Sequence, residues 1–93
     1  MVKTLIDQLA ALAKQNAETE GWSLTEALKR HEIELEENPS AKNMADVLWL
    51  QAATGYPYEI PSMNEDIAQQ VTGRLQQLKQ RLETTGSLRS NPG

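Results

Sequence analysis

The hydrophobic residues of this chain recur every three or four positions over long stretches, which is the spacing of one face of an α-helix. Four such stretches cover residues 4–19, 24–37, 41–54 and 63–84. A length of 93 residues is enough for one modest hydrophobic core. The pattern therefore predicts an all-α fold, a single four-helix domain over residues 1–86, followed by a disordered tail at 87–93.

Residues that favour helix starts stand where three of the stretches begin, namely Ser23, Ser40 and Ser62. Glu26 and Glu65 follow two of these serines at the spacing of a capping box. Thr4 and Asp7 form a similar pair at the beginning of the first stretch. We therefore expect all four helices to begin at side-chain caps.

The predicted helix ends coincide with residues that break helices. Pro39 ends the second helix, and Gly55 closes the third. Pro57 and Pro61 then favour an extended connection over residues 56–61. We expect this connection to pack as a strap over the core or to present its tyrosines to a partner.

The third stretch is apolar around nearly its whole circumference, as helices buried on several sides are. It is therefore the expected central element. On the second helix, His31 falls on the apolar stripe and Ile33 points to the other side.

The last helix carries a heptad-like stripe that leaves two interpretations open. Its apolar residues follow steps of three and four, as in Ala68, Val71, Leu75, Leu78 and Leu82. This stripe packs either inside the chain or against a second copy in a homodimer. At about 1.5 Å per residue the helix is roughly 33 Å long, so its far end is expected to outreach the body.

The net charge of −4 is unevenly distributed. Residues 1–66 hold five basic and twelve acidic residues, a balance of −7, whereas residues 67–93 hold four basic residues against one acid, a balance of +3. Nucleic-acid binding rests on Lys and Arg that neutralise phosphates. An acidic body therefore argues against direct binding of nucleic acid.

The residues that usually carry chemistry are scarce. The chain has no Cys and one His, His31, and its five glycines are scattered rather than gathered in a phosphate-binding loop. The serines are better explained as caps than as nucleophiles. We therefore expect no enzyme activity, no catalytic residues, no metal site and no cofactor.

The longest uncharged run, 47–58, is too short to span a bilayer. The expected setting is the cytoplasm.

One segment resembles a known family. Glu37-Asn38-Pro39-Ser40, followed by Met44-Ala45-Asp46-Val47-Leu48 and Gly55, is similar to the end of repressor-type helix-turn-helix domains. The resemblance covers about twenty residues and implies binding to DNA. The preceding helix is acidic where a helix that reads a groove presents Arg, Lys, Asn or Gln. No recognition residue is therefore transferred.

The leading hypothesis is a small acidic interaction module, an adaptor or regulator, that docks onto another protein with a basic surface and performs no catalysis. We assign partner binding to Glu32, Glu34, Glu36, Glu37, Trp49, Tyr56, Tyr58, Leu75, Leu78 and Leu82. One alternative is an acidic inhibitor that mimics nucleic acid and blocks a basic groove. Another is a degenerate helix-turn-helix regulator that binds DNA.

Overall fold

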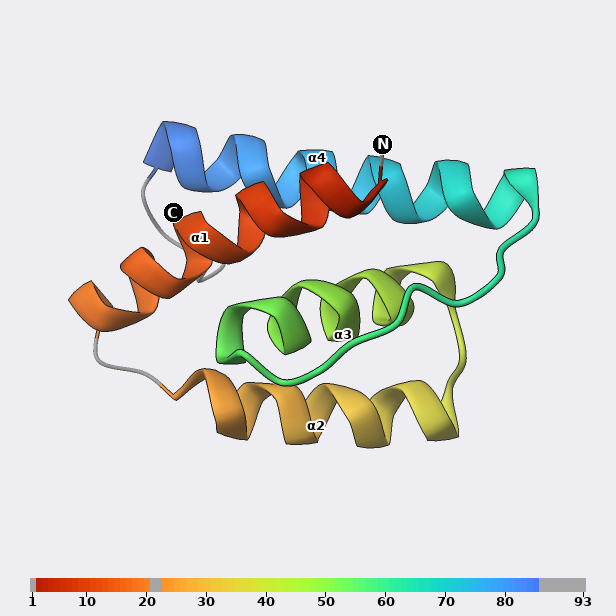
Figure 1. The fold of residues 1–93 in the computed structure, drawn as a ribbon, viewed down its shortest axis with the longest axis horizontal. Coiled ribbons are helices and arrows are strands. Elements are labelled where there is room, and N and C mark those ends of the chain that lie inside the picture. Colours follow the sequence, from red (N-terminus) through yellow and green to blue (C-terminus); the bar gives the residue numbers. More distant parts are fainter. Residues whose placement is uncertain (1, 21–22, 86–93) are drawn as a thin grey trace.

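The computed structural model describes residues 2–20 and 23–85, and within them the chain forms four α-helices and no strand. These are α1 (Val2–Glu20), α2 (Leu24–Glu37), α3 (Ala41–Thr54) and α4 (Glu65–Thr85), as Figure 1 shows. The predicted all-α, four-helix fold is confirmed. The tail predicted for residues 87–93 lies outside the described residues.

Two of the predicted serine caps are present. The Ser23 hydroxyl accepts a hydrogen bond from the Glu26 amide at 3.2 Å, and the Ser40 hydroxyl accepts one from the Asn43 amide at the same distance. Gly55 ends α3 with a φ of 78°, a left-handed conformation that glycine adopts without steric cost. The local signals for α2 and α3 are therefore sufficient to place these helix ends.

The caps predicted for the first and last helices, at Thr4 and Ser62, are wrong. α1 already begins at Val2, so Thr4 lies inside the helix. At α4 the cap is Asn64, whose side-chain oxygen accepts a hydrogen bond from the Ile67 amide at 2.9 Å, and not Ser62. Like a serine cap, Asn64 binds a backbone amide of the first helical turn that has no partner within the helix. This cap lies two residues after the predicted one. The connection therefore extends to residue 64.

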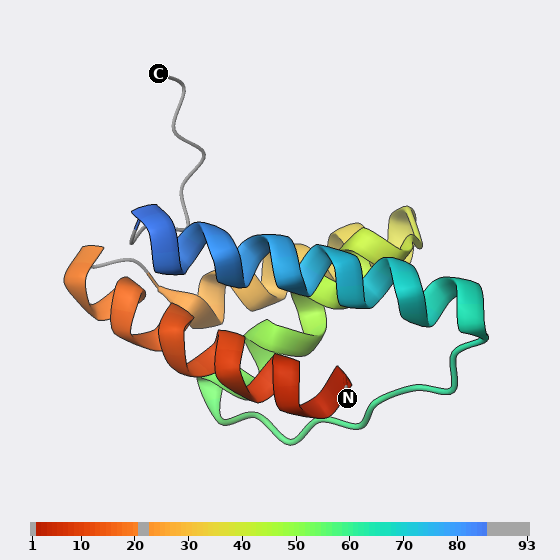
Figure 2. The ribbon, with the colours of Figure 1, turned by 90° about the horizontal axis from the view of Figure 1, so that it is seen from above.

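α3 is the central helix, as expected from its apolar circumference. It packs against α2 on one side and against α1 and α4 on the other (Figures 1 and 2). Asn43, Ala53 and all residues from Ala45 to Leu50 are buried. The side chain of Asn43 also donates to the Asn38 carbonyl oxygen at 2.8 Å, which braces the turn between α2 and α3.

The stripe of α4 faces inward along the length of the helix. Val71 and Leu75 are fully buried, and Leu78 and Leu82 are nearly so. The expected overhang of the last helix is therefore wrong, because its C-terminal half is covered, and α1 is the helix packed beside it in both views (Figures 1 and 2). The longest dimension of the molecule, 35 Å, is close to the roughly 31 Å expected for a helix of α4's length.

None of the helices in the described part of the chain has both the length and the hydropathy that crossing a membrane requires.

Candidate functional site

The C-terminal half of α2 carries four exposed carboxylates, which we call the acidic end of α2: Glu32, Glu34, Glu36 and Glu37. No ion pair joins any of them to another described residue. The last turn of α2 also contains no basic residue, although the negative end of the helix dipole favours cations there. The arrangement lowers the stability of the helix slightly and leaves the carboxylates available to a partner.

An exposed apolar side chain lies within this acidic surface. Ile33 is 57% exposed, on the face of α2 opposite to the one that contacts α3. An isolated exposed isoleucine is common on protein surfaces. Here it stands between carboxylates on both sides in the sequence, so the face combines charge with an apolar contact point.

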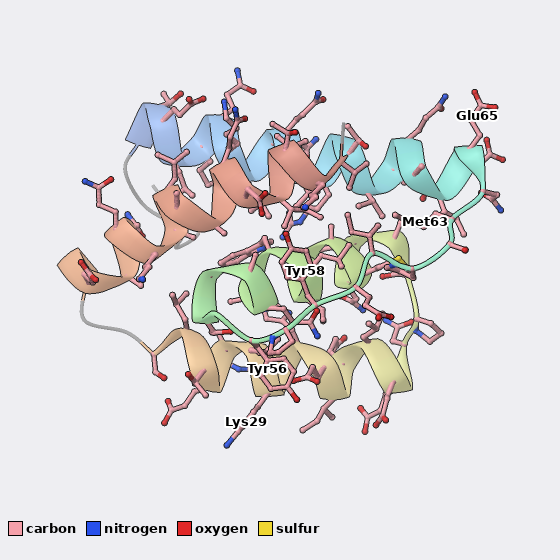
Figure 3. The ribbon with its side chains drawn as sticks, viewed as in Figure 1. Lys29, Tyr56, Tyr58, Met63 and Glu65 are labelled. Carbon is pink, nitrogen blue, oxygen red and sulfur yellow. The ribbon has the colours of Figure 1, made fainter. Side chains whose placement is uncertain are left out.

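The connection between α3 and α4 directs its two tyrosines to opposite sides. Tyr58 points toward α1, and Tyr56 lies on the side of the connection that faces α2, near Lys29 in the view of Figure 3. Tyr56 is 60% exposed, and Ile60 is also exposed. Tyr58 is half-buried against the core. Tyr58 therefore anchors the connection to the core, and Tyr56 is exposed to solvent.

The anchor of this connection is a hydrogen bond across the molecule. The Tyr58 hydroxyl donates to the Asp7 carboxylate of α1 at 2.7 Å. This bond, together with partial loss of hydration and the negative charge of Asp7, raises the pKa of the Tyr58 phenol above its ordinary value of about 10. At neutral pH the phenol is protonated and donates this hydrogen bond.

Four of the residues assigned to partner binding lie in the hydrophobic core. Trp49 is 5% exposed, and the leucines at 75, 78 and 82 are equally covered. The stripe formed by the three leucines of α4 packs within the chain, which was one of the two interpretations of the last helix. A contact surface drawn from the exposed side chains contains the acidic end of α2, Ile33 and Tyr56, without these four.

A buried carboxylate links three helices, and sequence reasoning missed it. Asp46 of α3 is 3% exposed. It accepts hydrogen bonds from Arg74 Nε of α4 at 3.2 Å and from Trp49 Nε1 at 3.4 Å. His31 Nδ1 of α2 lies 3.9 Å from the same carboxylate. A buried carboxylate requires a hydrogen-bond or ion-pair partner. The position of Asp46 within a largely apolar helix was the signal in the sequence that could have indicated such a cluster.

The geometry of this cluster fits a structural role. Both oxygens of Asp46 are used, since the second lies 3.5 Å from Arg74 Nη2. In the described residues no buried side-chain nitrogen or oxygen lacks a partner. His31 is partly buried, and Arg74 forms its ion pair within the chain.

A hollow of about 390 Å³ lies between α1 and the end of α3. Small residues form most of its lining, and its carboxylate, Asp7, is already bonded to Tyr58. Among the described residues no three His, Asp or Glu side chains converge as a metal would require. This hollow therefore offers few groups that could act on a ligand.

Comparisons with known proteins add no assignment: no family model matches the chain, and neither a curated protein nor a solved structure is significantly similar to it.

Proposed function

We propose that this protein is a docking module that binds a basic region of another protein through the acidic end of α2 and Ile33, with Tyr56, which lies near Lys29 of the same helix in Figure 3, as an exposed aromatic side chain. The observation that carries the proposal is the set of four exposed carboxylates without ion-pair partners among the described residues, at a helix end that disfavours them. Placing negative charge there costs some stability of the free chain. A basic partner offsets that cost.

Each component of this surface has a separate role in binding. Exposed carboxylates accelerate association with a positively charged partner and help to select it. Apolar and aromatic side chains that become desolvated supply most of the affinity in protein interfaces, and tyrosine is enriched among them. Ile33 and Tyr56 are the most exposed large apolar side chains in the described part of the chain.

A second candidate function uses the same carboxylates differently. An inhibitor that mimics nucleic acid places them where a basic groove expects phosphates, so that its affinity is electrostatic and depends strongly on salt. The helix-turn-helix alternative receives less support, because Lys42 is the only exposed residue of α3. A helix that reads bases needs an exposed polar face.

Affinity purification with matched variants as bait tests the proposal. Ile33→Ala and the double variant Glu36→Gln with Glu37→Gln should fold normally, since alanine favours helix and removing the two charges relieves the dipole conflict. A specific partner should be retained by wild type and recovered in smaller amounts with both variants. Glu18→Gln, an exposed acid near the end of α1, serves as the control and should retain it.

The affinities measured with the purified partner distinguish the two candidate functions. For a docking module, Ile33→Ala should weaken binding about tenfold, the size of a moderate hot spot. For a nucleic-acid mimic, Ile33→Ala should leave affinity unchanged, while raised salt should abolish binding. A partner bound equally by all variants would refute both functions.

A further inference from the structure

A second hollow lies between the first turn of α3 and the middle of α4, and no residue of the acidic end of α2 lines it. Its volume is about 340 Å³, and its lining consists of Ala41, Lys42, Gln70, Gly73, Arg74 and Gln77. The lining contains two cations, two amides and no carboxylate. This composition differs from that of the acidic body around it.

The two cations play different parts. Lys42 is exposed and forms no hydrogen bond or ion pair with another described residue. Arg74 is held in place by Asp46, which accepts from its Nε and Nη2 atoms at 3.2 and 3.5 Å. The guanidinium is thereby oriented in advance and retains donor hydrogens that Asp46 does not use.

Gly73 has no structural reason to be glycine. It lies inside α4, where glycine weakens a helix relative to alanine. A Cβ atom built on it would meet nothing within 4 Å, and its φ is not in the left-handed region. Since Gly73 lines the hollow, the direct effect of the missing side chain is to keep that hollow open.

The donors that line the hollow suit an anion with several oxygens. Asp46 uses Nε and Nη2 on one edge of Arg74, and the hydrogens on the other edge, carried by Nη1 and Nη2, are not used by Asp46. The lysine and the two glutamines add separate donors around them. Such a set suits the three oxygens of a phosphate group.

We propose that this hollow binds the phosphate group of a phosphate monoester, with Lys42 and Arg74 as its cationic contacts and Gly73 as the opening that admits it. The group belongs to a small metabolite or to a phosphorylated side chain, which share this chemistry. The proposal does not rest on the docking surface, because none of its residues belongs to the acidic end of α2.

Nuclear magnetic resonance titration of the full chain with inorganic phosphate tests the site, with sodium chloride exchanged to keep ionic strength constant. Saturable shifts should appear at Lys42, Gly73 and the side-chain amides of Gln70 and Gln77. Lys42→Ala should weaken binding about tenfold, the effect of losing a hydrogen bond to a charged group. Lys29→Ala, which removes an exposed lysine on α2, should leave it unchanged.

The variant Gly73→Gln separates binding from folding. Glutamine favours helix more than glycine, so the variant should melt at a temperature equal to or higher than that of wild type. Its side chain fills the hollow, so saturable binding should be lost. Wild-type affinity in this variant would overturn the proposal.

Titrations with glycerol 3-phosphate and with N-acetyl phosphoserine amide distinguish the two sources of the group. Tighter binding of the first supports a metabolite, and tighter binding of the second supports a phosphorylated protein. If chloride reproduces the shifts, or if none of the three phosphates gives a saturable response at the hollow, the proposal is wrong.

Discussion

Asp46 shows how one residue can stabilise the packing of several helices. A buried carboxylate loses its hydration, which costs several kcal/mol unless donors replace the water. Here Arg74 and Trp49 donate to it, and His31 lies close enough to form an ion pair when protonated. Because these donors come from three helices, the cluster favours one relative placement of α2, α3 and α4.

Removing the cation from this cluster should be more damaging than neutralising the acid. Arg74→Met leaves the Asp46 charge buried without its main partner, and we expect a loss of about 2–3 kcal/mol in the free energy of unfolding. Asp46→Asn keeps an acceptor for Trp49 and should lose about 1 kcal/mol.

Urea unfolding measures both effects, with Lys29→Met as the control. Lys29 is an exposed cation, so its loss should change stability by no more than about 0.5 kcal/mol. Wild-type stability in Arg74→Met would show that the pair contributes nothing.

Tyr58 gives a prediction for pH dependence. Its pKa is raised in the folded chain, chiefly by the hydrogen bond to Asp7, so folding favours the neutral phenol. The contribution to stability is therefore fully present below the unfolded pKa of about 10 and is lost as the pH rises through the folded pKa.

This dependence can be followed by ultraviolet titration of tyrosinate in the variant Tyr56→Phe, where Tyr58 is the only tyrosine left. Adding Asp7→Asn should lower the midpoint toward its ordinary value. An unchanged midpoint would mean that the bond to Asp7 does not govern the titration.

At the scale of the elements, the position at which a helix begins depends on which side chain accepts a hydrogen bond from the free amides of the first turn. Ser62 and Asn64 both have suitable side chains, and the chain uses Asn64. Pro61 lies directly before Ser62, and residues 62 and 63 belong to the extended connection rather than to the helix. The capping box was therefore predicted two residues too early.

Alanine substitutions test this assignment. Asn64→Ala removes the cap of α4 and should lower the free energy of unfolding by about 1 kcal/mol. Ser62→Ala, the matched control, should change it by only a few tenths of a kcal/mol, because Ser62 is exposed. Thermal or urea unfolding of the two variants decides the point, and a larger loss for Ser62→Ala would reverse the assignment.

At the scale of the whole molecule, the four helices are not equally held. α1, α3 and α4 pack against one another, whereas α2 packs chiefly on α3. Only Ala27 and Leu28 of α2 are buried. The element that carries the proposed docking surface is thus the one with the least tertiary support, and it lies at the edge of the molecule beside α3 (Figure 1).

Hydrogen exchange should reflect this difference. Elements with few buried apolar contacts open more readily, so amides of α2 should exchange faster than those of α3. Binding of a partner to the acidic end of α2 should slow exchange in α2. Equal protection of α2 and α3 in the free chain would contradict the prediction.

The acidic end of α2 could be read from the sequence as candidate surface, because the exposure of a helical face follows from its periodicity. Tyr56 was assigned to the same surface from the extended connection, whereas Ile33 was predicted only to point away from the apolar stripe. Trp49 and the leucines of α4 were assigned to the same surface and are buried. An apolar stripe shows which face of a helix is buried. It does not show whether that face packs against the same chain or against another chain.

The sequence by itself determined the helices and several of their ends, because caps, glycines and prolines act within three or four residues of their positions. It also determined that α3 is central, since a helix apolar on every side must be surrounded. Only the tertiary structure decided the contacts between Asp46 and Arg74, 28 residues apart, and between Asp7 and Tyr58, 51 residues apart. Such pairs depend on how the helices are placed against one another, which no local pattern specifies.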